Sequence, residues 1–150
     1  MPRELINSGI AGVGSYLPEQ ILTNADLEKI VDTNNEWILA RSGIGERRIA
    51  SPEQATSDLA VAAGIAAEEV DLVIVATNTP DMLFPATACL VQDRIGAKKA
   101  GAFDLAAGCT GFVYAMAVGS QFVAAGSCQT VLVIGAETLS RIINWGDRRT

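Results

Sequence analysis

Hydrophobic and polar positions divide the chain into short apolar runs separated by longer mixed segments. Three runs are almost wholly apolar, at residues 70–80, 101–105 and 130–137. Their length and their Val, Ile and Leu content are typical of strands that are buried on both faces. Small and apolar residues also alternate before Pro18, which predicts a buried strand over residues 10–16.

The segment between the first two predicted strands begins with two short helices. Asn24 is a plausible N-cap for the first, the pair Asn34–Asn35 separates the two, and Gly43 ends the second. Trp37 and Arg41 are four residues apart, so one helix face can bring a guanidinium beside an indole. The alternative is that this pair only covers its own patch of surface.

Further helices are predicted between the remaining strands. One begins near Thr56 or Ser57 and ends by Gly64, after a polar segment that reads as a loop, and another covers residues 86–95. A long helix that is apolar on nearly every face follows residue 111 and is expected to be buried. The alternation of strands and helices predicts an α/β layered fold with a mostly parallel sheet.

The most informative stretch is the turn between residues 101–105 and the long apolar helix. Its sequence, DLAAGCTGF, places Cys109 where the helix should begin, and unpaired N–H groups there favour a thiolate. Small residues around Cys109 leave room for a substrate, and their N–H groups could donate to an oxyanion (Ala106, Ala107, Gly108 and Gly111). The alternative is a buried packing cysteine. Asp104 should need hydrogen bonds, which the following turn could supply.

Composition narrows the function classes. The 150 residues carry a net charge of −6, which argues against a nucleic-acid partner, and no run is long enough to span a membrane. Residues 1–10 lack the apolar core of a signal peptide, so a cytoplasmic protein is expected. Cys89, Cys109 and Cys128 form no CxxC pair, which predicts neither a disulfide framework nor a metal site. The chain has no histidine, so it cannot supply a Cys–His pair by itself.

Four ordered motifs resemble one family. They are TNNEWILARSGIGERRI, VATNTPDMLFPATACLVQ, DLAAGCTGF and VIGAETLSR, and together they cover nearly the whole chain. They are similar to the N-terminal half of the β-ketoacyl-acyl-carrier-protein synthase III family, the initiating condensing enzymes of bacterial fatty-acid synthesis. The resemblance implies a thiolase-like layered fold with a mixed, mostly parallel sheet, of which residues 1–150 form one half of a duplicated fold.

The resemblance also implies roles for particular residues. Cys109 would take the acyl group of acetyl-CoA or another short acyl-CoA as a thioester, before decarboxylative condensation with malonyl-acyl-carrier protein. Trp37 and Arg148 match residues that hold the CoA adenine, and Thr33 and Arg41 match polar contacts near the nucleotide. Leu139 matches a wall of the acyl pocket. Phe84 matches a residue that crosses a homodimer interface, where residues 101–105 would pair with their copy. No cofactor or metal is implied, since acyl-CoA is the substrate.

Two departures from the family pattern matter. The family's catalytic His and Asn belong to a C-terminal half that this chain does not contain, so the chain alone is expected to be inactive in condensation. The helix after Ser57 is two to three turns shorter than the family predicts, judged at 3.6 residues per turn.

Other functions remain open at this point. A condensing enzyme for polyketide or quinolone starter units would carry the same motifs, and a non-catalytic half-domain would also lack His and Asn. A papain-like hydrolase is disfavoured, because the chain has no histidine to act as a base. The basic pairs Arg47–Arg48 and Arg148–Arg149 could meet an acidic carrier protein, although a solvated surface is the simpler interpretation.

Overall fold

The computed structural model describes residues 6–64, 67 and 69–148. The chain divides into two compact units. The sheet unit comprises Met1–Tyr16 and Ala55–Glu137, and the pocket unit comprises Leu17–Gln54 and Thr138–Thr150. Each unit is described separately below, within the described residues.

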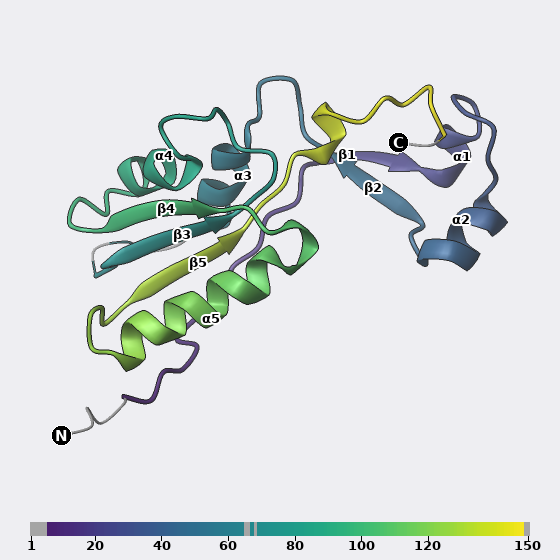
Figure 1. Cartoon of the computed structure of the whole chain (residues 1–150). Coiled ribbons are helices and arrows are strands. Elements are labelled where there is room, and N and C mark those ends of the chain that lie inside the picture. The colour runs from purple at the N-terminus through teal and green to yellow at the C-terminus, as the bar shows by residue number, and fades with distance from the viewer. Residues whose placement is uncertain (1–5, 65–66, 68, 149–150) are drawn as a thin grey trace. The chain divides into compact units, whose positions relative to one another are not determined.

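The sheet unit is built on three parallel strands in the order β4-β3-β5 (Figure 1). They are β3 (Leu72–Ala76), β4 (Gly101–Leu105) and β5 (Val131–Gly135). Leu72 is in register with Gly101 on one side and with Val131 on the other. Every residue of β3 is buried, as predicted from its unbroken apolar run.

Helices cover both faces of this sheet. α3 (Thr56–Ala62) and α4 (Thr87–Arg94) lie on one face, and α5 (Gly111–Ala124) lies on the other (Figure 1). Because successive side chains of a strand point to opposite faces, Val73 and Val75 pack with α3 and α4, whereas Ile74 packs with α5. The predicted α/β layers and the positions of these three strands and three helices are confirmed.

Two predictions for the sheet unit are wrong. Residues 10–16 form no strand, and the apolar side chains before Tyr16 are exposed, Val13 by 93%. Both edges of β3 are already paired with β4 and β5, so this segment finds no place beside the central strand. α5 is also not buried all round, because its buried positions in this chain are only Gly111, Ala115 and Gly119, which face the sheet.

The pocket unit contains a two-stranded antiparallel sheet and two short helices. β1 (Gln20–Thr23) pairs with β2 (Glu46–Ile49), and α1 (Asn24–Leu27) and α2 (Asn35–Ser42) lie between them in the chain. Residues 46–49 were predicted to lie in a loop, because their polar and charged side chains lack the pattern of a buried strand. A 3₁₀ turn, η2 (Leu139–Arg141), opens the C-terminal segment of the unit.

The caps of these helices correct one prediction and confirm two. Thr23, not Asn24, caps α1: its hydroxyl accepts from the Asp26 N–H, and the Asp26 carboxylate accepts from the Thr23 N–H at 3.2 Å. Asn24 is buried instead, and its side-chain amide donates to the Ile44 carbonyl. Asn34 lies between the two helices, as predicted, and caps α2, which begins at Asn35. Gly43 ends α2 with a φ of 71°, as predicted.

The helix after residue 55 is short, as predicted. α3 has seven residues, and Gly64 follows with a φ of 71°. Its start is as predicted too, but its hydroxyls do not cap it: the Asp58 carboxylate accepts from the Ala55 N–H at 2.7 Å, while Ser57 donates to Asp81. Residues 65, 66 and 68, which follow soon after this helix, lie outside the described residues.

Candidate active site

Cys109 lies in a tight turn at the carboxyl end of β4. The chain leaves β4 at Leu105 and passes through a 3₁₀ turn, η1 (Gly108–Thr110), before α5 begins at Gly111. Gly108 has a φ of 58°, a conformation that side-chain-bearing residues rarely adopt. Cys109 is exposed, so it is not the buried packing cysteine of the alternative interpretation. It lies two residues before the start of α5, slightly earlier than predicted.

Hydrogen bonds fix this turn from two sides. The Gly108 N–H donates to the Asn78 side-chain oxygen at 3.2 Å, and the Thr110 hydroxyl donates to the Ala107 carbonyl at 2.9 Å. The Gly111 N–H donates to the Gly108 carbonyl. Two of the N–H groups expected to face an oxyanion, those of Gly108 and Gly111, therefore already have intramolecular acceptors.

The Asp104 carboxylate accepts hydrogen bonds from a different element than predicted. It accepts the backbone N–H groups of Thr87 at 2.8 Å and Ala88 at 2.7 Å, at the start of α4. The turn that follows β4 was the predicted donor. An anionic group is stabilised at a helix N-terminus, so Asp104 fastens α4 to the strand that leads to Cys109.

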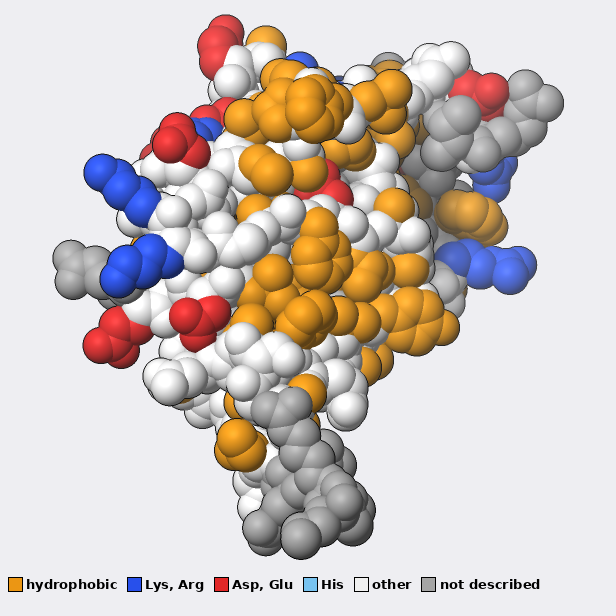
Figure 2. All heavy atoms as spheres, turned by 60° about the vertical axis from the view of Figure 1, so that its left-hand side comes forward, with side chains coloured by type: hydrophobic (Ala, Val, Ile, Leu, Met, Phe, Trp, Pro, Cys, Tyr) orange, Lys and Arg blue, Asp and Glu red, His pale blue; other side chains and the backbone are white. Residues whose placement is uncertain are grey.

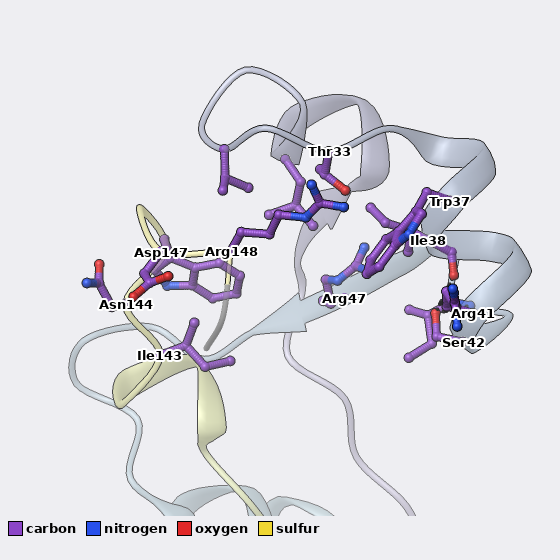
Figure 3. A pocket seen from close by; sticks show the side chains of 14 residues that line it. Thr33, Trp37, Ile38, Arg41, Ser42, Arg47, Ile143, Asn144, Asp147 and Arg148 are labelled. Carbon is purple, nitrogen blue, oxygen red and sulfur yellow. Dashed lines mark hydrogen bonds between the residues drawn. The ribbon is translucent and has the colours of Figure 1, made fainter.

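A pocket of about 360 Å³ occupies the pocket unit (Figure 3). The Arg148 guanidinium lies 4.8 Å from the centre of the Trp37 ring, and that of Arg41 lies 6.0 Å from it. Both separations are within the range of cation–π contacts. The predicted Trp37–Arg41 contact is thus formed, and a flat aromatic face with nearby positive charge is suited to a planar, anionic ligand.

Four of the predicted site residues line that pocket, and three do not. Thr33, Trp37, Arg41 and Arg148 all line it, although residues 41 and 148 are more than one hundred positions apart in the chain. Leu139 begins η2 and is 49% exposed without lining the pocket. Phe84 belongs to the sheet unit and is 88% exposed, and Cys109 belongs to that unit as well. Arg149 lies outside the described residues.

Several pocket residues were missed by the sequence interpretation. Arg47 also lines the pocket, and its guanidinium donates to the Asn24 side-chain oxygen. Four more come from the C-terminal segment: Ile143, Asn144, Trp145 and Asp147. Five others come from residues 27–44: Leu27, Val31, Ile38, Ser42 and Ile44. Trp145 was the available signal, because a second tryptophan beside a basic pair is unusual in a chain with only 5% aromatic residues.

The other two cysteines are partly buried, as predicted for packing residues. The Cys89 thiol faces the Ala102 carbonyl at 3.8 Å, and Cys128 packs against the core on the α5 face. Burial, and secondarily the charge of Asp71, raises the pKa of Cys128. Within the described residues, no three His, Cys, Asp or Glu side chains gather as a metal site would require. None of the described helices is long and apolar enough to cross a membrane.

Comparisons with known proteins agree with one another. The protein-family model for 3-oxoacyl-[acyl-carrier-protein] synthase III matches residues 103–150. The chain is 60% identical to a β-ketoacyl-[acyl-carrier-protein] synthase III of Caldanaerobacter subterraneus, over 98% of this chain and 47% of that protein. The chain spans about half the length of the curated relatives it matches.

Solved structures of similar proteins share the fold. The β-ketoacyl-[acyl-carrier-protein] synthase III of Thermus thermophilus superimposes with a TM-score of 0.87 at 53% identity, over 95% of this chain and 47% of that one. A priming β-ketosynthase from the R1128 polyketide pathway gives a TM-score of 0.86 at 36% identity, over 91% of this chain and 43% of that one. The predicted thiolase-like fold is therefore confirmed.

Proposed function

Because the chain belongs to the β-ketoacyl-[acyl-carrier-protein] synthase III family, of whose curated members it spans about half the length, we propose that it forms the acyl-accepting part of such a condensing enzyme. One observation carries the proposal: Cys109 is exposed in a glycine-containing turn between a parallel strand and a helix. A nucleophile in such a turn is accessible to a substrate and held by rigid elements on both sides.

The proposed chemistry begins with the Cys109 thiolate. It attacks the thioester carbonyl of acetyl-CoA or another short acyl-CoA, and the sulfur of CoA leaves as a thiol once it takes up a proton. The acyl group stays on Cys109 as a thioester. In the complete enzyme, a malonyl group on the carrier protein loses carbon dioxide, and its carbanion attacks the acyl carbon and releases the Cys109 sulfur.

The pocket around Trp37 is proposed to hold the nucleotide end of CoA. Trp37 offers its ring to the adenine, and the guanidinium of Arg148 lies against that ring at 4.8 Å. Arg41, Arg47 and Thr33 line the same pocket and supply positive charge and a hydroxyl for phosphate and ribose oxygens. No resident cofactor is needed for this role, and a cytoplasmic location fits it.

Two copies of the chain are proposed to pair through β4. This strand is at the edge of the three-stranded sheet, because β3 contacts it on one side only. An unpaired strand edge offers N–H and C=O groups to a second copy. Phe84 and Leu139 are assigned, by resemblance, to the partner's pocket and to the acyl pocket, respectively.

Acylation of Cys109 is the direct test. Incubation with acetyl-CoA, followed by peptide mass spectrometry, is expected to add one acetyl group to Cys109 and none to Cys89 or Cys128. Cys109→Ser should abolish the labelling, and Trp37→Ala should raise the acetyl-CoA concentration needed for half-maximal labelling. The chain alone is expected to release no carbon dioxide from malonyl-carrier protein. A Cys109 that stays unmodified, both alone and in any longer protein containing the chain, would contradict the proposal.

A second candidate is a condensing enzyme for polyketide starter units. The TM-score of 0.86 to a priming β-ketosynthase favours it, since that protein is as similar in fold as the fatty-acid enzymes are. A screen of acyl-CoA donors separates the two functions. Fastest acylation by acetyl-CoA supports the fatty-acid role, whereas fastest acylation by a larger starter acyl-CoA supports the polyketide role.

A further inference from the structure

Asn78 and Glu137 connect the carboxyl ends of all three parallel strands. Asn78 follows β3 by two residues, Glu137 follows β5 by two residues, and Gly108 lies in the turn after β4. The Asn78 side-chain oxygen accepts the Gly108 N–H at 3.2 Å, and the Asn78 side-chain amide donates to the Glu137 carboxylate at 2.9 Å. A continuous path of hydrogen bonds therefore runs from β5 through β3 to the residue before Cys109.

The Glu137 carboxylate anchors this path through three donors. Besides the Asn78 side chain, it accepts the Asn78 backbone N–H at 2.8 Å and the Thr79 hydroxyl at 2.6 Å. Thr79 is buried, and its own N–H donates to the Thr77 hydroxyl at 3.1 Å. Hydrogen bonds to a carboxylate are shorter and stronger than those between neutral groups, so the orientation of the Asn78 amide is well defined.

The Asn78 amide can therefore point only one way. Its NH₂ group faces Glu137, which accepts, and its oxygen must face the Gly108 N–H, which donates. Gly108 in turn has the left-handed φ of 58° that turns the chain toward Cys109. We propose that Asn78 and Glu137 act as a clamp that fixes the turn carrying Cys109, and so positions its sulfur for acyl transfer.

This inference rests on the proposed function for its chemical role, and neither residue is assigned a contact with substrate. Asn78 and Glu137 are positioning residues, because they act on Cys109 through the Gly108 backbone. Displacing a reacting group by about 1 Å can cost up to about 100-fold in rate, so loosening the clamp should slow acylation without weakening CoA binding.

Asn78→Ala is the first test. It is expected to speed hydrogen exchange at the Gly108 amide, measured by NMR, and to slow acetylation of Cys109 by about 10- to 100-fold. The acetyl-CoA concentration for half-maximal rate should not change. Asp71→Asn is the matched control, since Asp71 is another carboxylate that accepts two backbone N–H groups, those of Gln129 and Thr130, but at the opposite strand ends. That variant should leave both readouts at Cys109 and Gly108 unchanged.

A second test exchanges the amide and the carboxylate between residues 78 and 137. A loss of stability alone could not produce the recovery that this test expects. Asn78→Asp keeps an acceptor for Gly108 but sets two carboxylates against each other, so acetylation should slow. Adding Glu137→Gln to that variant supplies an amide to donate to the introduced carboxylate, and acetylation should recover most of the lost rate. A double variant no faster than Asn78→Asp would overturn the proposal.

The remaining outcomes are also decisive. Unchanged exchange at Gly108 in Asn78→Ala, or faster exchange with unchanged acetylation, would overturn the clamp. If Cys109 of the unmodified chain accepts no acetyl group, the proposed function fails instead. Gly108 exchange then decides the clamp by itself: protection that is lost in Asn78→Ala supports a fixed turn, and equal exchange in both proteins overturns it.

Discussion

Carboxylates stand at the strand ends of the sheet unit, where regular hydrogen bonding stops. Asp71 accepts the N–H groups of Gln129 and Thr130 at one end, while Asp104 and Glu137 accept N–H groups at the other. A buried or half-buried N–H without an acceptor is costly, so each carboxylate stabilises the connection where it lies. The two N–H groups also lower the pKa of Asp71, because they stabilise its charged form.

The pKa of the Cys128 thiol is expected to depend on the charge of Asp71. Burial raises the pKa of Cys128 first, and the negative charge of Asp71 raises it further. Asp71→Asn removes that charge and keeps the burial, so the pKa of Cys128 should fall part of the way toward its ordinary value. The rate of iodoacetamide alkylation at Cys128, followed against pH by peptide mapping, is expected to rise at a lower pH in the variant.

A control for this measurement lies on the other face of the sheet. Asp93 is exposed near the end of α4, so Asp93→Asn removes the same charge from a helix that does not cover Cys128. Its alkylation profile should match that of the unmodified chain. An equal shift in both variants would mean that net charge, rather than Asp71, sets the reactivity.

Among the elements, α5 is the helix whose sheet-facing side is set by the small size of its residues rather than by their polarity. Gly111, Ala115 and Gly119 recur every four residues and form the face that meets the sheet. A Cβ on Gly119 would lie 3.1 Å from methyl carbons of both Val131 and Val133. The helix therefore packs closely against β5 because these positions carry almost no side chain.

Gly119→Val is expected to push α5 away from β5. The added carbons have no space between Val131 and Val133, and such overpacking lowers the free energy of unfolding by about 1–3 kcal/mol. Ala117→Val is the matched control, because Ala117 is exposed on the same helix, and its effect should stay within about 0.5 kcal/mol. Urea unfolding followed by circular dichroism measures both. A Gly119→Val protein as stable as the control would contradict the close packing.

Sequence patterns predicted the elements of the sheet unit well and the pocket unit less well. β3, β4 and β5 coincide with short, almost wholly apolar runs between helices, and the length and composition of such runs are typical of strands buried on both faces. β2 was missed because it pairs only with β1 and therefore keeps charged side chains such as Arg48. Residues 10–16 have the pattern of a strand, yet pattern alone does not show whether a segment pairs with a strand of the sheet.

The residues of the candidate site were likewise predicted only in part. The glycines around Cys109 predicted an exposed thiol from local sequence, and the structure agrees. Trp37 and Arg148 are too distant in the chain for spacing to join them, so only the family resemblance could. Asn78 and Glu137 are polar residues near the carboxyl ends of two apolar runs, and because parallel strands share a carboxyl edge, both could have been predicted to meet there.

At the scale of the whole molecule, much apolar surface is open to solvent. Figure 2 shows hydrophobic side chains gathered into a broad patch on one face. α5 alone exposes five large apolar side chains: Phe112, Val113, Tyr114, Met116 and Phe122. Patches of this kind mark interaction surfaces in soluble proteins. Because the chain spans about half the length of its relatives, we expect another protein surface to cover this face.

Self-association of the isolated chain should therefore depend on α5. Val113→Glu combined with Met116→Glu places two charges on its exposed face and should reduce oligomers in sedimentation velocity at equal concentration. The matched control puts one extra charge on an exposed polar position of the same unit, Gln129→Glu. Oligomers that persist unchanged in the α5 variant would indicate that another surface, such as the β4 edge, holds the copies together.

The two tryptophans of the chain, Trp37 and Trp145, both line the pocket of the pocket unit, and the sheet unit has none. Tryptophan emission is consequently a built-in optical label for the pocket unit. When excitation is restricted to wavelengths that tyrosine does not absorb, an emission change on adding a nucleotide would come from the pocket unit alone. Melting of the sheet around Cys109 would then leave no direct trace in the spectrum, since Tyr16 and Tyr114 of the sheet unit would not be excited.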